Sequence, residues 1–259
     1  TVPIGAAVLT VAVDVQPDRL EYEVLGHGRQ GATWSVEYDV IYGNIMMAEP
    51  WEKLRAVLYR TWPTEGGATL GVSAMAVDTG FMPERAYAFA LKEARPHVSS
   101  GGYQLDHQRT VVLIKGAARG WTREIESYSP YESAQKRGGL YIFHAGTSFL
   151  KARLYEHLRA EPGAVGQCWF PQNRELPYFH GLVSEECLQE RGKMVWTKIG
   201  AARNEPLDCR VYGMAAAHML RLHAWTDARW EKEISKTIRT QHAIKPPTRE
   251  RFQVAAAMD

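Results

Sequence analysis

Two aspartates stand where buried, apolar stretches of the sequence end. Asp14 follows the apolar residues 8–13, and Asp78 follows residues 70–77. A carboxylate at the exit of a buried strand is costly unless a cation or hydrogen-bond donors meet it, so both residues are candidates for cation binding. Taken alone, each is more typical of a turn in which the aspartate bonds its own backbone. A third acid at the same place would favour cation binding.

Asp208 is such an acid, because it begins the clearest helical pattern in the chain, residues 207–222. Apolar side chains recur three, four, seven, eleven and fourteen positions after it, at Val211, Tyr212, Ala215, Met219 and Leu222. Asp208 therefore shares the face that packs on a sheet, although the helix dipole alone also favours an acid in a first turn. Three such acids can converge into an all-oxygen cage, which suits Mg²⁺ or Mn²⁺ rather than zinc.

The chemistry that needs this cage is phosphodiester hydrolysis. Two metal ions about 3.5–4 Å apart can activate a water, stabilise the charge at phosphorus and hold the leaving oxygen, so a few carboxylates suffice. Other chemistries lack their motifs, because the sequence contains no GxxxxGK[ST], no GxSxG and no HExxH. Residues 26–31 fit GxGxxG, but a strand-like segment follows them, which predicts a glycine-rich hairpin. His218 and His223 are five residues apart, which predicts different helix faces.

The order of the predicted elements indicates how these acids are positioned. Apolar alternation and turn residues predict strands over residues 8–14, 19–25, 33–41, 70–78, 111–115 and 140–145, with short strands at 167–170 and 194–199. Helical patterns cover residues 50–62, 83–94, 147–159, 178–189, 207–222 and 227–240. A three-stranded meander followed by alternating helices and strands predicts an α/β fold, one mixed sheet flanked by helices. By fold-level analogy this is the order of ribonuclease H-like nucleases.

Composition sets the broad class of the protein. The chain has 259 residues, 45% of them hydrophobic and 23% charged, which is typical of a folded globular chain. No apolar run approaches the ~20 residues of a membrane helix, so we expect no membrane partner. Lys and Arg total 31 against 29 Asp and Glu, so a polyanion would need a local basic surface. Three cysteines without paired spacing indicate a reducing cytosol rather than a disulfide framework.

Four segments carry a resemblance to a known family. They are VAVDVQPDRLEYEVLGHG at residues 11–28, AVDTG at 76–80, YFHGLVSEE at 178–186 and RNEPLDCRVYGMAAA at 203–217. In this order they resemble the nuclease region of lambda-like phage terminase large subunits, and the first and last are the most specific. In that family an N-terminal packaging ATPase is joined to a ribonuclease H-like endonuclease that cuts concatemeric double-stranded DNA. The missing P-loop and initiator Met lead us to expect the second half only.

The resemblance implies specific roles and partners. Asp14, Asp78 and Asp208 would be the metal ligands and catalytic residues, holding two Mg²⁺ or Mn²⁺ ions. Double-stranded DNA would be the substrate, and the ATPase domain, the small terminase subunit and the portal would be partners in the full-length protein, in the host cytoplasm. We expect residues 1–224 to form the endonuclease domain and residues 225–259 a C-terminal helical, basic extension.

Further residues are weaker candidates. Lys115, at the exit of a strand, is a candidate for contact with the scissile phosphate, and Glu185 and Glu205 are spare carboxylates, Glu205 also being a helix-start residue. Four basic residues in polar segments could track a DNA backbone: Arg119, Arg123, Lys136 and Arg137. Two alternatives stay open, namely a ribonuclease H-like recombinase or resolvase, and a catalytically silent module that docks the packaging motor on the portal or on DNA.

Overall fold

The computed structural model describes residues 1–99, 102–105, 108–117, 134–137, 140–190 and 193–239. Its centre is one mixed sheet of nine strands. Their bounds are β1 Val8–Gln16, β2 Arg19–His27, β3 Thr33–Tyr42, β4 Thr61–Pro63, β5 Thr69–Asp78, β8 Thr110–Gly116, β9 Ala134–Arg137, β10 Leu140–Ala145 and β11 Cys168–Trp169. The order across the sheet is β11-β3-β2-β1-β5-β8-β10-β9, with β4 beside β5.

The first three strands form the predicted antiparallel meander, and β5, β8 and β10 run parallel to β1. β1 pairs antiparallel with β2 and parallel with β5, which in turn pairs parallel with β8, and β8 with β10. A 3-10 turn at Arg29–Gly31 joins β2 to β3, so the GxGxxG segment is a hairpin connection as predicted. The parallel strands bring their carboxyl ends to one edge of the sheet, which is where β1 and β5 carry their aspartates.

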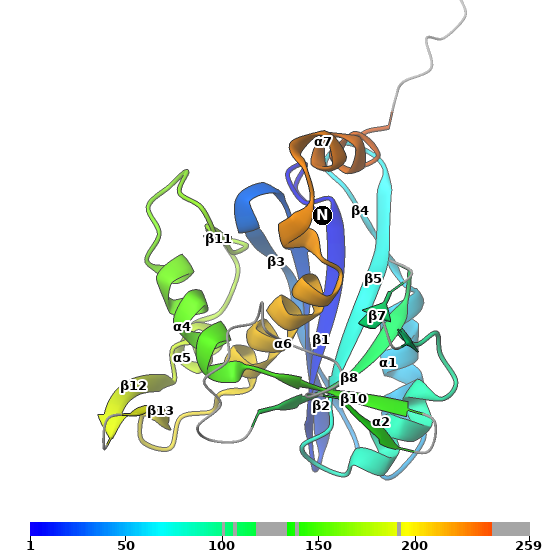
Figure 1. Cartoon of the computed structure of the whole chain (residues 1–259), viewed down its shortest axis with the longest axis vertical. Helices are drawn as coiled ribbons and strands as arrows, with labels where there is room; N and C mark the ends of the chain where they lie inside the picture. Colours follow the sequence, from blue (N-terminus) through cyan, green and yellow to red (C-terminus); the bar gives the residue numbers. More distant parts are fainter. Residues whose placement is uncertain (100–101, 106–107, 118–133, 138–139, 191–192, 240–259) are drawn as a thin grey trace, which may run out of the picture.

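Helices cover both faces of the sheet (Figure 1). The described helices are α1 Glu49–Tyr59, α2 Pro83–Ala90, α4 Thr147–Leu158, α5 Leu176–Leu182, α6 Glu205–Met219 and α7 Asp227–Ser235. Leu9, Val11 and Val13 of β1 pack in one core cluster with α1 and α2, whereas Ala12 packs in the other with α4, α5 and α6. Because successive side chains of a strand point to opposite faces of the sheet, each strand contributes to both core clusters. The predicted ribonuclease H-like α/β fold is confirmed.

Helix α6 lies diagonally across β1 and close to the sheet (Figure 1). A Cβ atom at Gly213 would collide with the end of the Leu25 side chain, which would have to shift. The same Cβ would lie 3.7 Å from that of Ala12 on β1. Small residues therefore let α6 approach the sheet closely, and the first turn of this helix carries Asp208.

Several predicted helices were too long, including that over residues 83–94, which ends at Ala90. Residues 178–189 divide into α5 and a strand, β12 (Glu185–Glu190), which pairs with β13 (Lys193–Lys198) in a separate hairpin. The helix stops because the Ser184 hydroxyl donates to the carbonyl of Gly181 and the backbone then pairs across the hairpin. Helix α1 stops at Tyr59, because β4 pairs with β5. Helix α7 stops at Ser235, and the chain then bonds to the turn between β4 and β5.

The prediction for His218 and His223 was also wrong. Their rings stack with centroids 4.3 Å apart and planes 7° from parallel. Helix α6 ends at Met219, and Arg221 adopts a left-handed conformation at φ 57° before the 3-10 turn Leu222–Ala224. Five residues therefore do not follow one continuous helix, and the angular argument for separate faces does not apply.

Two stretches near the ends of the described chain meet at the β4–β5 turn. The backbone N–H of Val2 donates to Pro63 and that of Glu65 donates to Val2, while Arg239 donates to the carbonyl of Gly66 at 2.8 Å. The hydroxyl of Thr64 donates to the carbonyl of Thr237 at 2.5 Å. Earlier in the chain, Trp230 of α7 is buried in the same core cluster as the apolar residues of α6. The division of the chain at residues 224 and 225 stays a prediction.

Candidate functional site

Three elements bring the three predicted aspartates to one edge of the molecule. The register of β1 with β5 pairs Ala12 with Ala76 and Val13 with Val77, so Asp14 and Asp78 come next on the two strands. Both follow the alternation of the alanines and therefore face the layer of α6. Asp208 enters from the first turn of that helix.

Burial raises the pKa of all three carboxyl groups, and neighbouring acids add to this effect at Asp14 and Asp208. Asp14 is 5% exposed and Asp78 is 7% exposed. The pKa of Asp14 is raised to about 8, mainly by burial, with a hydrogen bond from Gln16 opposing the shift and the charges of Asp208 and Asp78 adding to it. Burial likewise raises the pKa of Asp208 to about 6, with Glu185 and Asp78 adding to the effect and Lys151 opposing it. The three acids therefore share one electrostatic environment.

Neutral groups hold these carboxylates in place. Nε2 of Gln16 donates to Oδ2 of Asp14 at 2.5 Å, and Nδ2 of Asn204 donates to Oδ2 of Asp208 at 2.9 Å. Asp78 accepts from the Tyr212 hydroxyl at 3.2 Å and from the backbone N–H of Gly80 at 3.1 Å. The turn-forming bond expected of Asp78 is thus present, and it leaves the carboxylate among the other acids. Burial raises the pKa of Asp78, against the hydrogen bonds and the nearby charge of Lys115.

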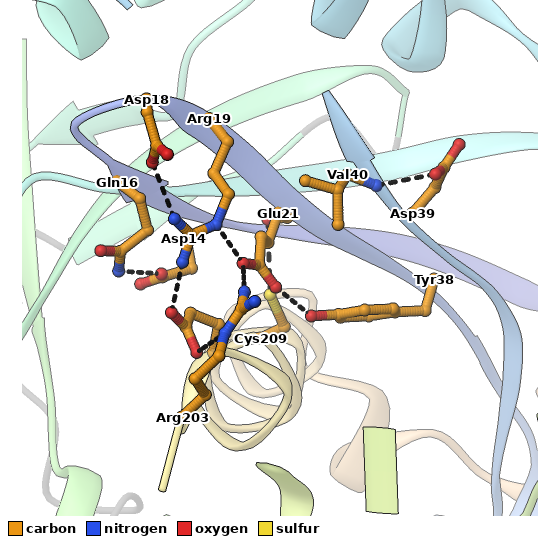
Figure 2. A network of polar contacts seen from close by, with 11 residues as sticks. Asp14, Gln16, Asp18, Arg19, Glu21, Tyr38, Asp39, Val40, Arg203 and Cys209 are labelled. Carbon is orange, nitrogen blue, oxygen red and sulfur yellow. Dashed lines mark hydrogen bonds and ion pairs between the residues drawn. The ribbon is translucent and has the colours of Figure 1, made fainter. Parts of the chain in front are cut away.

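A second set of acids beside Asp14 is matched by arginines. Figure 2 shows Glu21 accepting from Arg19, from Arg203 and from the hydroxyl of Tyr38. The Arg19 guanidinium also reaches Oε1 of Glu205 at 2.6 Å, and Nε of Arg203 lies 3.3 Å from Oε2 of the same residue. In this structure Glu205 therefore serves as an arginine partner at the start of α6.

A buried lysine on α4 approaches the cluster from the other side. Nζ of Lys151 lies 2.7 Å from Oε2 of Glu185 and 3.7 Å from Oδ1 of Asp208. Nδ2 of Asn204 donates to both Glu185 and Asp208, at 3.0 and 2.9 Å. The weaker candidate Glu185, at the start of β12, is therefore joined to the site by a lysine and an asparagine. Lys115 is the penultimate residue of β8, beside His144 of β10, and it is exposed.

The donor set fits a hard divalent cation in type. All three aspartates offer carboxylate oxygens, the ligands that Mg²⁺ and Mn²⁺ prefer, and a cation would relieve the cost of their shared burial. In the described part of the chain, no three His, Cys, Asp or Glu side chains are gathered at the spacing that holds a metal ion. The three aspartates therefore have the ligand chemistry of a divalent-metal site, and metal binding would require their carboxylates to move closer together.

Sequence reasoning missed Lys151, Asn204 and Tyr212. A signal for Lys151 exists, since Leu154 and Tyr155 follow it by three and four residues, so the lysine stands on the apolar stripe of α4. Among the predicted DNA-tracking residues, Arg119 and Arg123 lie outside the described residues. Lys136 and Arg137 belong to strand β9 rather than to a loop.

The helices in the described part of the chain are all too short or too polar to cross a membrane. This finding bears only on the residues that the structure describes.

Comparison with known proteins gives consistent matches. The family model described as "Terminase large subunit gpA, endonuclease domain" matches residues 1–230. The terminase large subunit of Escherichia phage lambda is 27% identical over 245 residues, covering 90% of this chain and 35% of the relative. That of Enterobacteria phage P21 is 26% identical over 227 residues, covering 83% of this chain and 33% of the relative. The chain thus spans about a third of the length of these relatives.

Proposed function

Because the chain belongs to the family of terminase large subunit gpA endonuclease domains, we propose that it cuts concatemeric double-stranded DNA by metal-dependent hydrolysis. The family makes the protein an endonuclease, a hydrolase of phosphodiester bonds. It also favours this reading over a recombinase or resolvase. Beyond that, the proposal assigns Asp14, Asp78 and Asp208 as the catalytic residues and ligands of two Mg²⁺ or Mn²⁺ ions.

One observation carries the assignment. Asp14, Asp78 and Asp208 come from three separate elements and meet at one edge of the sheet. The charges of Asp78 and Asp208 help to raise the pKa of Asp14, and the charge of Asp78 helps to raise that of Asp208, while the adjacent Glu21 and Glu205 are matched by arginines. Gathering three carboxylates at one place, two of them buried, costs free energy that a bound cation would relieve, and acids perturbed in this way are typical of functional sites. The divalent ions, when bound, would supply an activated water and stabilise the charge that develops on the phosphoryl oxygens.

The chain's own residues prepare the site for this reaction. Gln16, Tyr212 and Asn204 orient the three aspartates through hydrogen bonds to one oxygen each. Lys115, exposed at the end of β8 and close enough to influence Asp78, is suited to contact a phosphate of the DNA strand. The arginine pairs occupy the carboxylates of Glu21 and Glu205. Among the described residues, Asp14 and Asp78 have no ion pair, and Asp208 has only the Lys151 ammonium at 3.7 Å.

The setting follows from the same family. We propose that the full-length protein joins this domain to a packaging ATPase and works with the small terminase subunit and the portal in the host cytoplasm. The endonuclease would then cut the DNA concatemer at the start and the end of packaging. These roles rest on relatives that this chain matches over about a third of their length.

Plasmid nicking tests the reaction. We expect the chain to nick supercoiled plasmid with Mg²⁺ or Mn²⁺ and not with EDTA, and we expect Asp14→Asn, Asp78→Asn and Asp208→Asn each to abolish nicking while leaving the protein folded. Asp39→Asn is the matched control, because Asp39 is exposed on β3 and should leave activity unchanged. Cleavage that survives EDTA, or a folded Asp208→Asn variant with full activity, would refute the assignment. Metal-independent DNA binding without cleavage in the wild type would favour the silent docking module.

A further inference from the structure

Lys151 is the cation nearest to Asp208, and the nuclease chemistry described above does not use it. Its side chain is only 11% exposed, although lysine is among the residue types least often buried. It projects from α4 on the same stripe as Leu154, which is fully enclosed in the core. A lysine held in this position gives up most of its hydration, so its partners must compensate.

Its partners form a closed ring of four side chains. The Lys151 ammonium contacts Glu185 at 2.7 Å and Asp208 at 3.7 Å, and the Asn204 amide bridges the same two acids from the opposite side. Lys151, Glu185, Asn204 and Asp208 come from α4, β12, the residue before α6 and α6 itself. Because three elements meet in the ring, the position of the Asp208 carboxylate depends on all of them.

The ring has an electrostatic consequence for cation binding. An ammonium near Asp208 supplies positive charge at one side of the acid cluster, where a divalent ion would also be attracted. The same ammonium binds Glu185 more closely than Asp208, so one oxygen of that glutamate is occupied by the lysine and the other by Asn204. Both effects oppose metal binding on this side of the cluster.

We propose that Lys151 is a positioning residue that acts as an internal counter-cation: it keeps Glu185 out of the metal ligands and weakens divalent metal binding at Asp208. This inference rests on the proposed function, since it presumes that Asp208 binds metal. Lys151 competes with the divalent ion for the same carboxylates, and entry of the ion displaces its contact with Asp208. The ring thereby sets how much divalent metal the site needs.

Mn²⁺ affinity, measured by electron paramagnetic resonance of the free ion with the whole chain, is the readout. Lys151→Met removes the competing charge, so we expect the Mn²⁺ dissociation constant to fall by about tenfold, the effect expected of one unit charge acting over several ångströms in a partly hydrated site. Glu185→Gln should raise the dissociation constant several-fold, because the ammonium loses its closest partner and moves onto Asp208. A residue that only stabilises the fold would change the melting temperature and not these constants.

The double variant Lys151→Met/Glu185→Gln separates the proposal from its main rival. If Glu185 acts only through Lys151, the double variant regains wild-type or tighter Mn²⁺ binding. If Glu185 is itself a metal ligand, the double variant stays as weak as Glu185→Gln, which overturns the proposal. Should Lys151→Met fail to fold, because Glu185 is then left buried without its cation, the comparison of Glu185→Gln with the double variant still decides.

Lys53→Met is the matched control. Lys53 is an exposed lysine on α1 that pairs with Glu49 at 2.8 Å, so the variant removes the same charge away from the acids and should leave the Mn²⁺ constant unchanged. A Lys151→Met protein that folds and binds Mn²⁺ no more tightly than the wild type overturns the inference alone. A wild type that binds no Mn²⁺ at all overturns the proposed function as well, so the two failures are distinguishable.

Discussion

Glu23 of β2 and Arg210 of α6 form an ion pair in the interior of the protein, where their side chains are 0% and 1% exposed. Nη1 of Arg210 is 3.5 Å from Oε1 of Glu23, and the Tyr178 hydroxyl donates to the same oxygen at 2.7 Å. Within the described residues, Oε2 of Glu23 and both Nη atoms of Arg210 have no hydrogen-bond partner. The pair is therefore buried, loosely matched and dependent on each charge to offset the other.

Arg210→Met leaves the Glu23 carboxylate enclosed with one hydroxyl donor. Removing one partner of a buried pair costs about 3–5 kcal/mol, and a chain of this size loses about 2–4 °C of melting temperature per kcal/mol. We therefore expect a fall of about 6–20 °C. Glu23→Gln should cost a similar amount, because it leaves the guanidinium uncompensated. The double variant removes both charges and keeps an acceptor for Tyr178, so it should return to within about 2 kcal/mol of the wild type.

Urea unfolding of the four proteins measures this cycle. The coupling energy between the two sites should be at least about 4 kcal/mol, with unchanged m-values showing that the unfolded ensemble is the same. Lys236→Met is the matched control, since Lys236 pairs with Glu233 at 2.6 Å on the surface and should cost under about 1 kcal/mol. If Arg210→Met costs no more than this control, or if the two single changes add without coupling, the reasoning is wrong.

Two further predictions concern pH and metal. Burial and the charge of Arg210 lower the pKa of His27 to about 3, so below pH ~6.5 the unfolded chain binds a proton that the folded chain does not, and stability should fall by about 1.4 kcal/mol per pH unit. His27→Gln should flatten that slope in urea titrations, and equal slopes would contradict this. Asp14 has a raised pKa of about 8, so the metal-free fold loses stability as pH rises from ~4 to ~8, and Asp14→Asn should stabilise it in EDTA at pH 8. Mn²⁺ at a hundredfold excess over its dissociation constant should stabilise the wild type by about 2.7 kcal/mol; an equal shift in Asp14→Asn would exclude Asp14 as a ligand.

The sheet and the three aspartates could be predicted because each follows from local pattern. Asp14 and Asp78 end apolar strands, and their convergence needs only that the two strands run parallel and in register. Asp208 follows from the helical period alone. Side-chain identity and spacing are sufficient for these placements.

The surroundings of the aspartates depend on long-range contacts that the sequence pattern does not contain. Nothing in the spacing pairs Glu205 with Arg19, which lies 186 residues earlier in the chain. The sequence predicts helix over Glu185–Glu190, but these residues form a strand because their pairing with β13 determines the conformation. Lys151 alone had a local signal, because it stands on an apolar stripe of its helix. A lysine in such a position predicts an acidic partner in the interior.

The contacts at the β4–β5 turn determine how the protein responds when its ends are pulled apart. Val2 and Thr237–Arg239 bond to neighbouring residues of one turn, at the end of β5 remote from Asp78. Tension between these two stretches is carried by a few backbone hydrogen bonds, loaded one after another, rather than by shear along the central strands. The segment after α7 would peel away first at low force, while the strands that carry Asp14 and Asp78 stay paired.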